Sequence, residues 1–279
     1  MTLFLNFRTR PVGGAVNPDP QLYDGLADRV QPGWSPVPSF QLRTLFAGKS
    51  VLFAVHGFNV TQSNGTVAMG LLDQYLALAA PELFVGVLWP GDSVIPVVDY
   101  PFEGSVAIDC GKGLADFCNN FLSSAQSISF VSHSLGARLV LEAVSRLDRK
   151  ARSVCLTAAA VNRDCLTAEY ANAAQNSEQI SMLASREDLV LKVAFSVGDP
   201  LAELLHDDHT PFQAALGSNG PPTPAPAQVR APWQISDTKE TGDYGHSDYL
   251  PPSAPDKWPR VADFMKRAFH DQSQVWPTP

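Results

Sequence analysis

Serine, histidine and aspartate side chains in this sequence occur where they could together activate a hydroxyl group. Ser134 stands in the stretch Ser132-His133-Ser134-Leu135-Gly136, and His246 follows much later in Gly245-His246-Ser247. A serine hydroxyl is a weak nucleophile until a histidine takes its proton, and an aspartate commonly orients that histidine. These residue types could therefore perform acyl transfer through serine, although Ser-x-Ser-x-Gly alone also fits an ordinary buried turn.

The residues around Ser134 predict a strand, a sharp turn and a helix. Ile128, Phe130 and Val131 form a β-branched and aromatic run, and apolar residues at helical spacing follow from Val140 to Leu147. This pattern places the serine at the apex of the turn.

Apolar runs of strand length alternate with helical patterns along most of the chain. Residues 51–55 are typical of a central parallel strand, a helix around 67–76 follows, and 83–89 form the next strand. The other elements expected are edge strands at 2–8 and 40–45, a short helix near 22–28, irregular chain at 93–104, helices at 106–122, 167–184 and 258–270, and strands at 153–161, 189–196 and 233–237. The alternation predicts an α/β fold, with helices on both faces of a mostly parallel sheet.

Polar residues follow several of these strands, and functional groups of parallel sheets gather beyond the carboxyl ends of the strands. His56-Gly57-Phe58-Asn59 ends the 51–55 strand, and His246 follows the last one. Two aspartates, Asp164 and Asp199, stand beyond later strands and compete for the role of acid. Each also fits the N-cap of a helix, a common position for aspartate.

With these motifs the chain resembles the α/β-hydrolase superfamily. It resembles in particular a bacterial branch of unknown function that carries a His-Gly-Phe-Asn strand end, an Ala-or-Ser-His-Ser-Met-or-Leu-Gly turn and a Gly-His-Ser segment near the C-terminus. The similarity covers residues 51–250, in the superfamily order of serine, acid and histidine. The resemblance implies a nucleophile elbow in which Ser132 replaces the usual glycine, so we expect a tighter elbow that is still intact.

Carried over residue by residue, the resemblance implies a role for each candidate. Ser134 would be the nucleophile, His246 the base, and Asp199 the acid, because Asp199 follows the expected penultimate strand. The backbone N–H groups of Phe58 and Leu135 would form the oxyanion hole. Residues expected at the substrate are His56, Gly57, Asn59, His133 and Tyr100, with the His133 side chain directed away from the nucleophile.

Composition limits the other classes of function. The 279 residues carry a formal net charge of −8, which argues against a nucleic-acid-binding surface. No run approaches the ~20 apolar residues of a membrane span, so we expect a cytoplasmic chain without an integral membrane segment. The four cysteines lack metal or disulfide spacing and should be buried. No metal or cofactor is expected, since the nearest cluster, His206-Asp207-Asp208-His209, fits a solvated turn.

The sequence thus predicts a single α/β-hydrolase domain over residues 1–279, in which 1–50 supply edge strands and loops and no large cap is inserted. The expected activity is that of a serine hydrolase cleaving small-molecule esters with short acyl groups, in an open site walled by Phe58, the 93–102 loop and part of 200–232. Val94, Ile95, Val97 and Tyr100 should supply apolar surface. A non-catalytic binding protein and an amide- or peptide-cleaving enzyme are the alternatives, and the complete set of Ser134, Asp199 and His246 favours an enzyme. The oligomeric state stays open.

Overall fold

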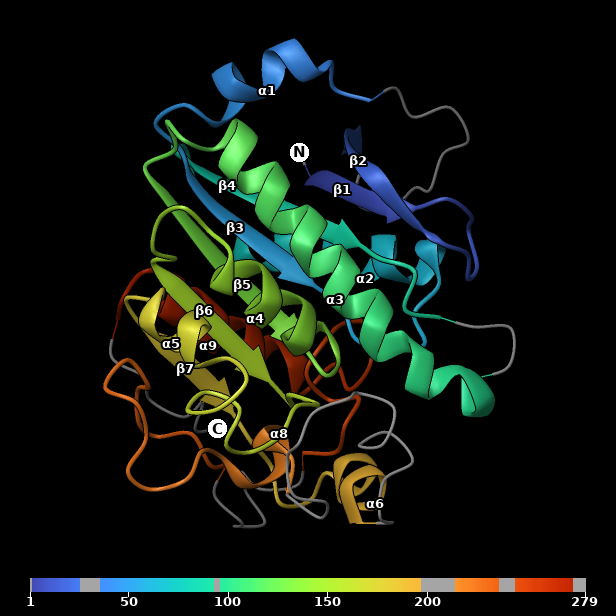
Figure 1. Ribbon diagram of the computed structural model, residues 1–279, viewed down its shortest axis with the longest axis vertical. Coiled ribbons are helices and arrows are strands. Elements are labelled where there is room, and N and C mark those ends of the chain that lie inside the picture. The colour runs from blue at the N-terminus through green and yellow to red at the C-terminus, as the bar shows by residue number, and fades with distance from the viewer. Residues whose placement is uncertain (1, 26–35, 93–95, 197–213, 236–243, 273–279) are drawn as a thin grey trace.

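The computed structural model describes residues 2–25, 36–92, 96–196, 214–235 and 244–272. Its described strands form one sheet in the order β2-β1-β4-β3-β5-β6-β7 (Figure 1). The strands are β1 Thr2–Arg8, β2 Val16–Gly25, β3 Ser50–Val55, β4 Glu82–Leu88, β5 Ser127–His133, β6 Ser153–Thr157 and β7 Ile180–Leu183. Only the β1–β2 pair is antiparallel among them. The predicted α/β class and mostly parallel sheet are confirmed.

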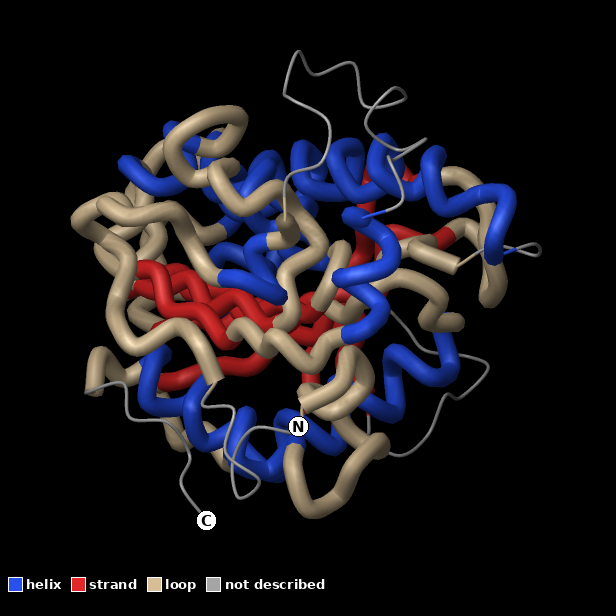
Figure 2. The backbone as a smooth tube through the Cα atoms, turned by 90° about the horizontal axis from the view of Figure 1, so that it is seen from below, coloured by secondary structure: helices blue, strands red, loops and turns tan. Residues whose placement is uncertain are grey.

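Helices cover both faces of the sheet. The described helices are α1 Ser39–Phe46, α2 Gln62–Leu76, α3 Pro96–Phe121, α4 Gly136–Ser145, α5 Ala171–Gln175, α6 Leu189–Ser196, α8 Leu216–Asn219 and α9 Trp258–Phe269. Helix α3 packs against α4 on one face, and α2 packs against α9 on the other (Figure 1). Figure 2 shows helices on both sides of the sheet. Within the described residues, no helix has both the length and the apolar character needed to cross a membrane.

The strands at the centre of the sheet are apolar because both of their faces are covered. All six residues of β3 are buried between β4 and β5, as expected for a parallel strand inside an α/β sheet. Phe53 of β3 and Phe130 of β5 stack with ring centroids 5.6 Å apart. This packed centre fixes the strand ends from which the polar residues of the site extend.

Several elements differ from the sequence prediction at the N-terminal edge. β1 was expected at the edge, but β2 pairs with its outer side, and residues 22–25 belong to β2 instead of a helix. Residues 40–45 lie in helix α1, which buries Leu42 and Phe46 four positions apart and exposes Phe40. This spacing is helical, with one face of α1 against the core.

The second group of differences lies after β4. Helix α3 begins at Pro96, so residues 96–104 are not irregular, and residues 189–196 form helix α6 instead of a strand. The strand nearest to α6 is β7, within a stretch that was expected to be helical. Beyond it, residues 229 and 234 form isolated bridges with Ile180 and Ala184 and no regular strand. The short apolar runs misled the prediction because their periodicity does not distinguish a strand from a buried helix.

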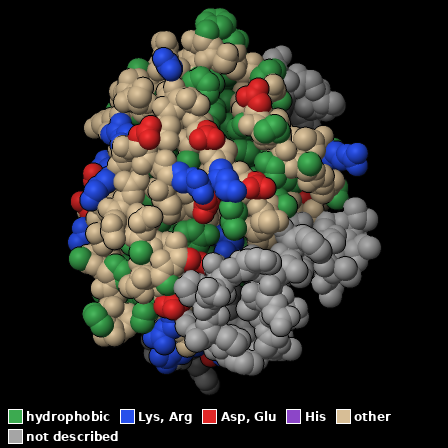
Figure 3. Space-filling model, in the orientation of Figure 1, with side chains coloured by type: hydrophobic (Ala, Val, Ile, Leu, Met, Phe, Trp, Pro, Cys, Tyr) green, Lys and Arg blue, Asp and Glu red, His purple; other side chains and the backbone are tan. Residues whose placement is uncertain are grey.

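The surface of the face in Figure 3 carries mixed charge. Lysine and arginine side chains lie interspersed with aspartate and glutamate there (Figure 3). The four cysteines are free and buried, as predicted.

Candidate active site

Ser134 lies at the apex of a tight turn between β5 and α4. Its φ angle is 54°, in the left-handed region that non-glycine residues seldom adopt. The Ser134 N–H donates to the carbonyl of Thr157 at 3.0 Å, and the Ser134 carbonyl accepts from the N–H groups of Ala137 and Ala160 at 3.0 and 3.1 Å. The turn is therefore held from the end of β6 as well as from α4, and a strained residue held in this way often marks a functional site.

Two glycines let the end of β3 lie directly against this turn. A Cβ atom at Gly136 would lie 2.5 Å from the His56 carbonyl oxygen, and one at Gly57 would lie 2.9 Å from Cβ of Ser134. Side chains at either position would therefore push the two segments apart. Ser132 stands where a glycine is usual. It is buried and pairs with Val55 in the register of β5 with β3, so the turn forms with a serine at this position, as expected.

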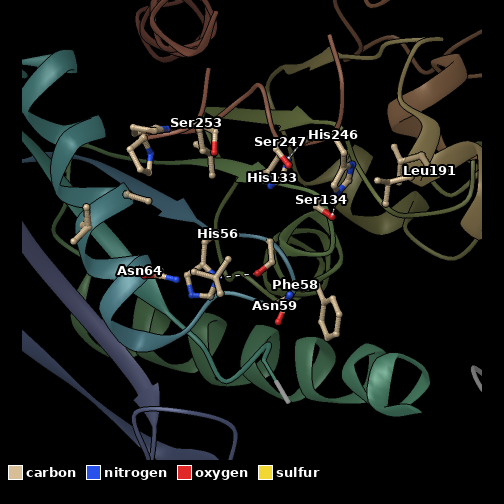
Figure 4. A pocket seen from close by; sticks show the side chains of 18 of the residues that line it. His56, Phe58, Asn59, Asn64, His133, Ser134, Leu191, His246, Ser247 and Ser253 are labelled. Carbon is tan, nitrogen blue, oxygen red and sulfur yellow. Dashed lines mark hydrogen bonds between the residues drawn. The ribbon is translucent and has the colours of Figure 1, made fainter. Parts of the chain in front are cut away.

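Hydrogen bonds join Ser134, His246 and Asp188 in one continuous arrangement. Figure 4 shows the first two of these side chains, with the His246 ring beside Ser134. His246 Nε2 lies 2.8 Å from Ser134 Oγ, and His246 Nδ1 lies 2.8 Å from Asp188 Oδ2. A neutral imidazole that donates Nδ1–H to the carboxylate leaves Nε2 to accept the serine proton. The Asp188 side chain is fully buried, whereas the His246 side chain keeps 16% of its surface exposed. This geometry suits a nucleophile, its base and an orienting acid.

The carboxylate in this arrangement belongs to a residue that the sequence reasoning missed. Asp199 was expected to follow a strand at 189–196, but those residues form α6, and Asp199 itself lies outside the described residues. Asp164 lies in the turn after β6, where its carbonyl accepts the N–H of Thr167. Asp188 follows β7 and precedes α6 directly. A polar residue before an apolar helical run is an N-cap signal that could have located it.

His133 contacts the main chain of His246. Its Nε2 lies 2.8 Å from the carbonyl oxygen of His246, and the two imidazole rings are 5.0 Å apart (Figure 4). Burial, followed by the neighbouring His246, lowers the pKa of His133 to about 3. His133 therefore stays neutral near pH 7, and its side chain reaches toward the His246 loop.

His56 supports the chain that follows β3. It is fully buried, its ring stacks on Trp89 at 5.7 Å, and its Nδ1–H donates to the Gly57 carbonyl at 2.9 Å. The indole N–H of Trp89 donates to the His56 carbonyl at 2.8 Å. Burial lowers the pKa of His56 to about 3, with smaller effects from Arg8 and His133 in the same direction. This imidazole is thus a neutral structural element at the edge of the site.

The residues expected to form an oxyanion hole lie next to the serine. Leu135 is the N-cap residue of α4, where helix N–H groups lack partners within the helix. Phe58 follows Gly57, and the next residue, Asn59, donates its N–H to the Gly91 carbonyl at 2.6 Å. A hydrogen bond to the segment that follows β4 thus holds the chain after β3.

A cavity of about 1120 Å³ opens over Ser134 and His246. Four of the five residues expected at the substrate, His56, Gly57, Asn59 and His133, line it, as does Phe58. Its apolar walls come from α2, α6 and the loop after His246, through Val67, Ala68, Leu189, Val190, Leu191, Leu250, Pro251 and Pro252. The segment 93–102 was expected to be a loop, and this was wrong for residues 96–102, which are helical. Residues 93–95 and the Tyr100 side chain lie outside the described parts, so their expected place in the wall of the site stays a prediction.

A metal site does not emerge from the described residues. Among them, no group of three or more His, Cys, Asp or Glu side chains is placed to hold a metal ion. The His206-Asp207-Asp208-His209 segment falls outside the described ranges.

Comparisons with known proteins agree with this fold. The family model "Alpha/beta hydrolase of unknown function (DUF900)" matches residues 41–229, more than half of the chain. No curated protein matches the chain.

The solved structures that the chain matches are distant in sequence and only partly similar in structure. An uncharacterized protein from Bacillus cereus ATCC 10987 is 12% identical at a TM-score of 0.46, and the match covers 86% of this chain and 64% of that one. The ydeN gene product from B. subtilis is 15% identical at 0.41, with 79% and 98% covered. Esterase PE8 is 17% identical at 0.43, with 80% and 94% covered. Similarities at this level do not bear on the activity of this chain.

Proposed function

We propose, from the premise that the chain belongs to the family of α/β hydrolases of unknown function, that this hydrolase is a serine esterase. It would cleave carboxylic esters with short acyl groups through an acyl-enzyme intermediate. The observation that supports this proposal is the unbroken contact from Ser134 Oγ through His246 to Asp188, at 2.8 Å on each side of the imidazole.

The first half-reaction forms the acyl-enzyme. His246 Nε2 takes the Ser134 proton as Oγ attacks the ester carbonyl, and the buried Asp188 carboxylate stabilises the imidazolium that results. The N–H groups of Phe58 and Leu135 donate to the oxyanion of the tetrahedral intermediate. His246 then gives its proton to the departing alkoxide, which leaves as an alcohol.

The second half-reaction releases the acid. Water enters from the open cavity and loses a proton to His246 as its oxygen attacks the acyl carbon. Collapse of the second tetrahedral intermediate breaks the bond to Ser134, whose oxygen recovers the proton from the imidazolium. A carboxylic acid leaves and the enzyme returns to its starting state.

The cavity supports a substrate with apolar groups. Leu189 and Val190 line it with 66% and 54% of their surfaces exposed, and covering such surface with an apolar group is favourable. The described chain between β6 and Asp188 holds only α5 and β7 as regular elements. Little of that interval is available to form a cap, which favours an open site.

Esterase turnover in single and double mutants tests the proposal. Ser134→Ala and His246→Ala should each lower kcat by roughly 10⁴-fold or more, and the double mutant should lose little beyond the worse single mutant, because such residues act as a unit. Ser123→Ala, at an exposed turn, is the matched serine control, and His270→Ala is the matched histidine control. Wild-type turnover of p-nitrophenyl acetate by pure Ser134→Ala would exclude the mechanism.

A further inference from the structure

We propose that His133 is a positioning residue that fixes the backbone of His246 relative to the elbow through its Nε2–H bond to the His246 carbonyl. The inference rests on the proposed function for its catalytic consequence, since it concerns the base of that reaction. The hydrogen bond itself is a structural observation and can be tested separately.

The direction of this hydrogen bond is fixed by chemistry. A backbone carbonyl only accepts, so the His133 nitrogen 2.8 Å from it must carry the proton. The same ring lies 5.0 Å from the ring of His246 and 5.9 Å from that of Tyr249. The imidazole of His133 thus contacts the His246 loop through one directed bond and through ring packing.

The other hydrogen bonds of the His246 side chain do not hold its main chain. Ser134 and Asp188 both hold the imidazole ring, and neither fixes the main chain from which the ring extends. A neighbouring bond, from the Gly245 N–H to the Asp248 carboxylate at 2.8 Å, links the loop to Lys257, which donates to the same carboxylate oxygen at 2.8 Å, and does not reach the elbow. His133 ties the carbonyl of His246 itself to the end of β5, one residue from the nucleophile. Nucleophile and base are therefore held by the same strand end.

A neutral donor is well suited to this position. A cation there would oppose the imidazolium that His246 becomes during the reaction, and burial keeps His133 uncharged. The titratable groups that face it are His246, Asp188, His56 and Tyr249. Gly57 makes room for the ring, because a Cβ there would lie 2.9 Å from Nδ1 of His133. Lysine or arginine would supply a donor only together with a charge.

The test compares variants of His133 that differ in how far a hydrogen-bond donor of the side chain extends from the backbone. The amide nitrogen of Gln extends about as far as Nε2 of histidine, whereas that of Asn stops short and Leu has no donor. We expect His133→Leu and His133→Asn to lower kcat by roughly 10- to 100-fold at nearly unchanged KM, since small misplacements of a catalytic group cost about this much. His133→Gln should stay within roughly fivefold of wild type. His270→Leu, whose partner Glu82 is remote from the site, is the control.

A second readout is independent of activity. Hydrogen exchange of the backbone amides at 244–250 should be faster in His133→Leu and His133→Asn than in wild type, and close to wild type in His133→Gln. Equal kcat and equal exchange in all three folded variants would overturn the inference, as would an equal loss in Gln, Asn and Leu. If Ser134→Ala kept full turnover, the proposed function would fail, while the exchange pattern would still decide whether His133 anchors the loop.

Discussion

Asp188 Oδ2 lies 2.8 Å from Nδ1 of His246, while the second oxygen of the same carboxylate accepts the N–H of Leu191 at 3.0 Å and caps helix α6. One buried residue thus holds the imidazole of His246 and caps the helix whose first turn lines the cavity. Capping and catalysis are often alternative interpretations of an aspartate beyond a strand. Here one carboxylate oxygen caps the helix and the other contacts His246, so the two proposed roles of Asp188 do not compete for the same atom.

Asp188→Asn should separate these two roles. Asparagine is as good an N-cap as aspartate, so the variant should unfold at nearly the wild-type temperature. Its amide cannot provide the negative charge that supports the imidazolium, and kcat/KM should fall by about 10³–10⁴-fold. Asp188→Ala should lower activity as well, and it should also lower the free energy of unfolding by about 1 kcal/mol, because alanine cannot cap α6. Asp164→Asn is the matched control, and a greater loss in Asp164→Asn or Asp199→Asn would assign the acid to that residue.

The two buried imidazoles should make the fold sensitive to acid. The pKa values of His56 and His133 are lowered to about 3, while an unfolded histidine titrates near 6.5, so the unfolded chain takes up protons that the folded chain does not. The free energy of unfolding therefore has its full value, as far as these two histidines are concerned, above about pH 6.5. It decreases as the pH falls toward about 3, by roughly 1.4 kcal/mol per pH unit for each histidine. Urea unfolding at pH 7, 6 and 5 measures this slope. His133→Gln should make it shallower, and an unchanged slope would show that His133 is not held neutral.

The apolar first turn of α6 should influence acyl preference. Hydrolysis of p-nitrophenyl acetate, butyrate and palmitate should favour the short esters without a lipid–water interface. Leu189→Ser should lower kcat/KM for butyrate relative to acetate by roughly fourfold, which corresponds to the burial of about one methylene group. Phe40→Ser, which changes another exposed apolar residue on α1, should leave the ratio unchanged. A rate that rises only above the critical micelle concentration, with palmitate preferred, would contradict the open site.

Much of the scaffold was predictable because its signals are local. The apolar β3, the turn at Ser134 and the amphipathic α9 each carry their own pattern in the sequence. β2 was not predicted because Pro18 and Pro20 interrupt its pattern, and proline is tolerated in strands mainly at an edge. The position of β2 at the sheet edge depends on the tertiary structure and is not encoded in its local sequence.

The site was predictable to the extent that chain order defines it. Ser134 and His246 were chosen as partners from motif order although 112 positions separate them. Asp188 was missed because the apolar residues after it were interpreted as a strand, which moved the expected acid onward to Asp199. The bond between His133 and the His246 carbonyl depends on how two loops pack, and no local pattern encodes it.

Labelling with a fluorophosphonate probe tests the central claim most directly, because the reagent reacts with a serine only when a base activates it. We predict one adduct per chain on the peptide that contains Ser134, detected by mass spectrometry. Labelling should be absent in Ser134→Ala, slowed by orders of magnitude in His246→Ala and Asp188→Asn, and unchanged in Ser123→Ala. An unlabelled wild-type protein, or equal labelling of Ser134→Ala, would contradict the claim that Ser134 is an activated nucleophile.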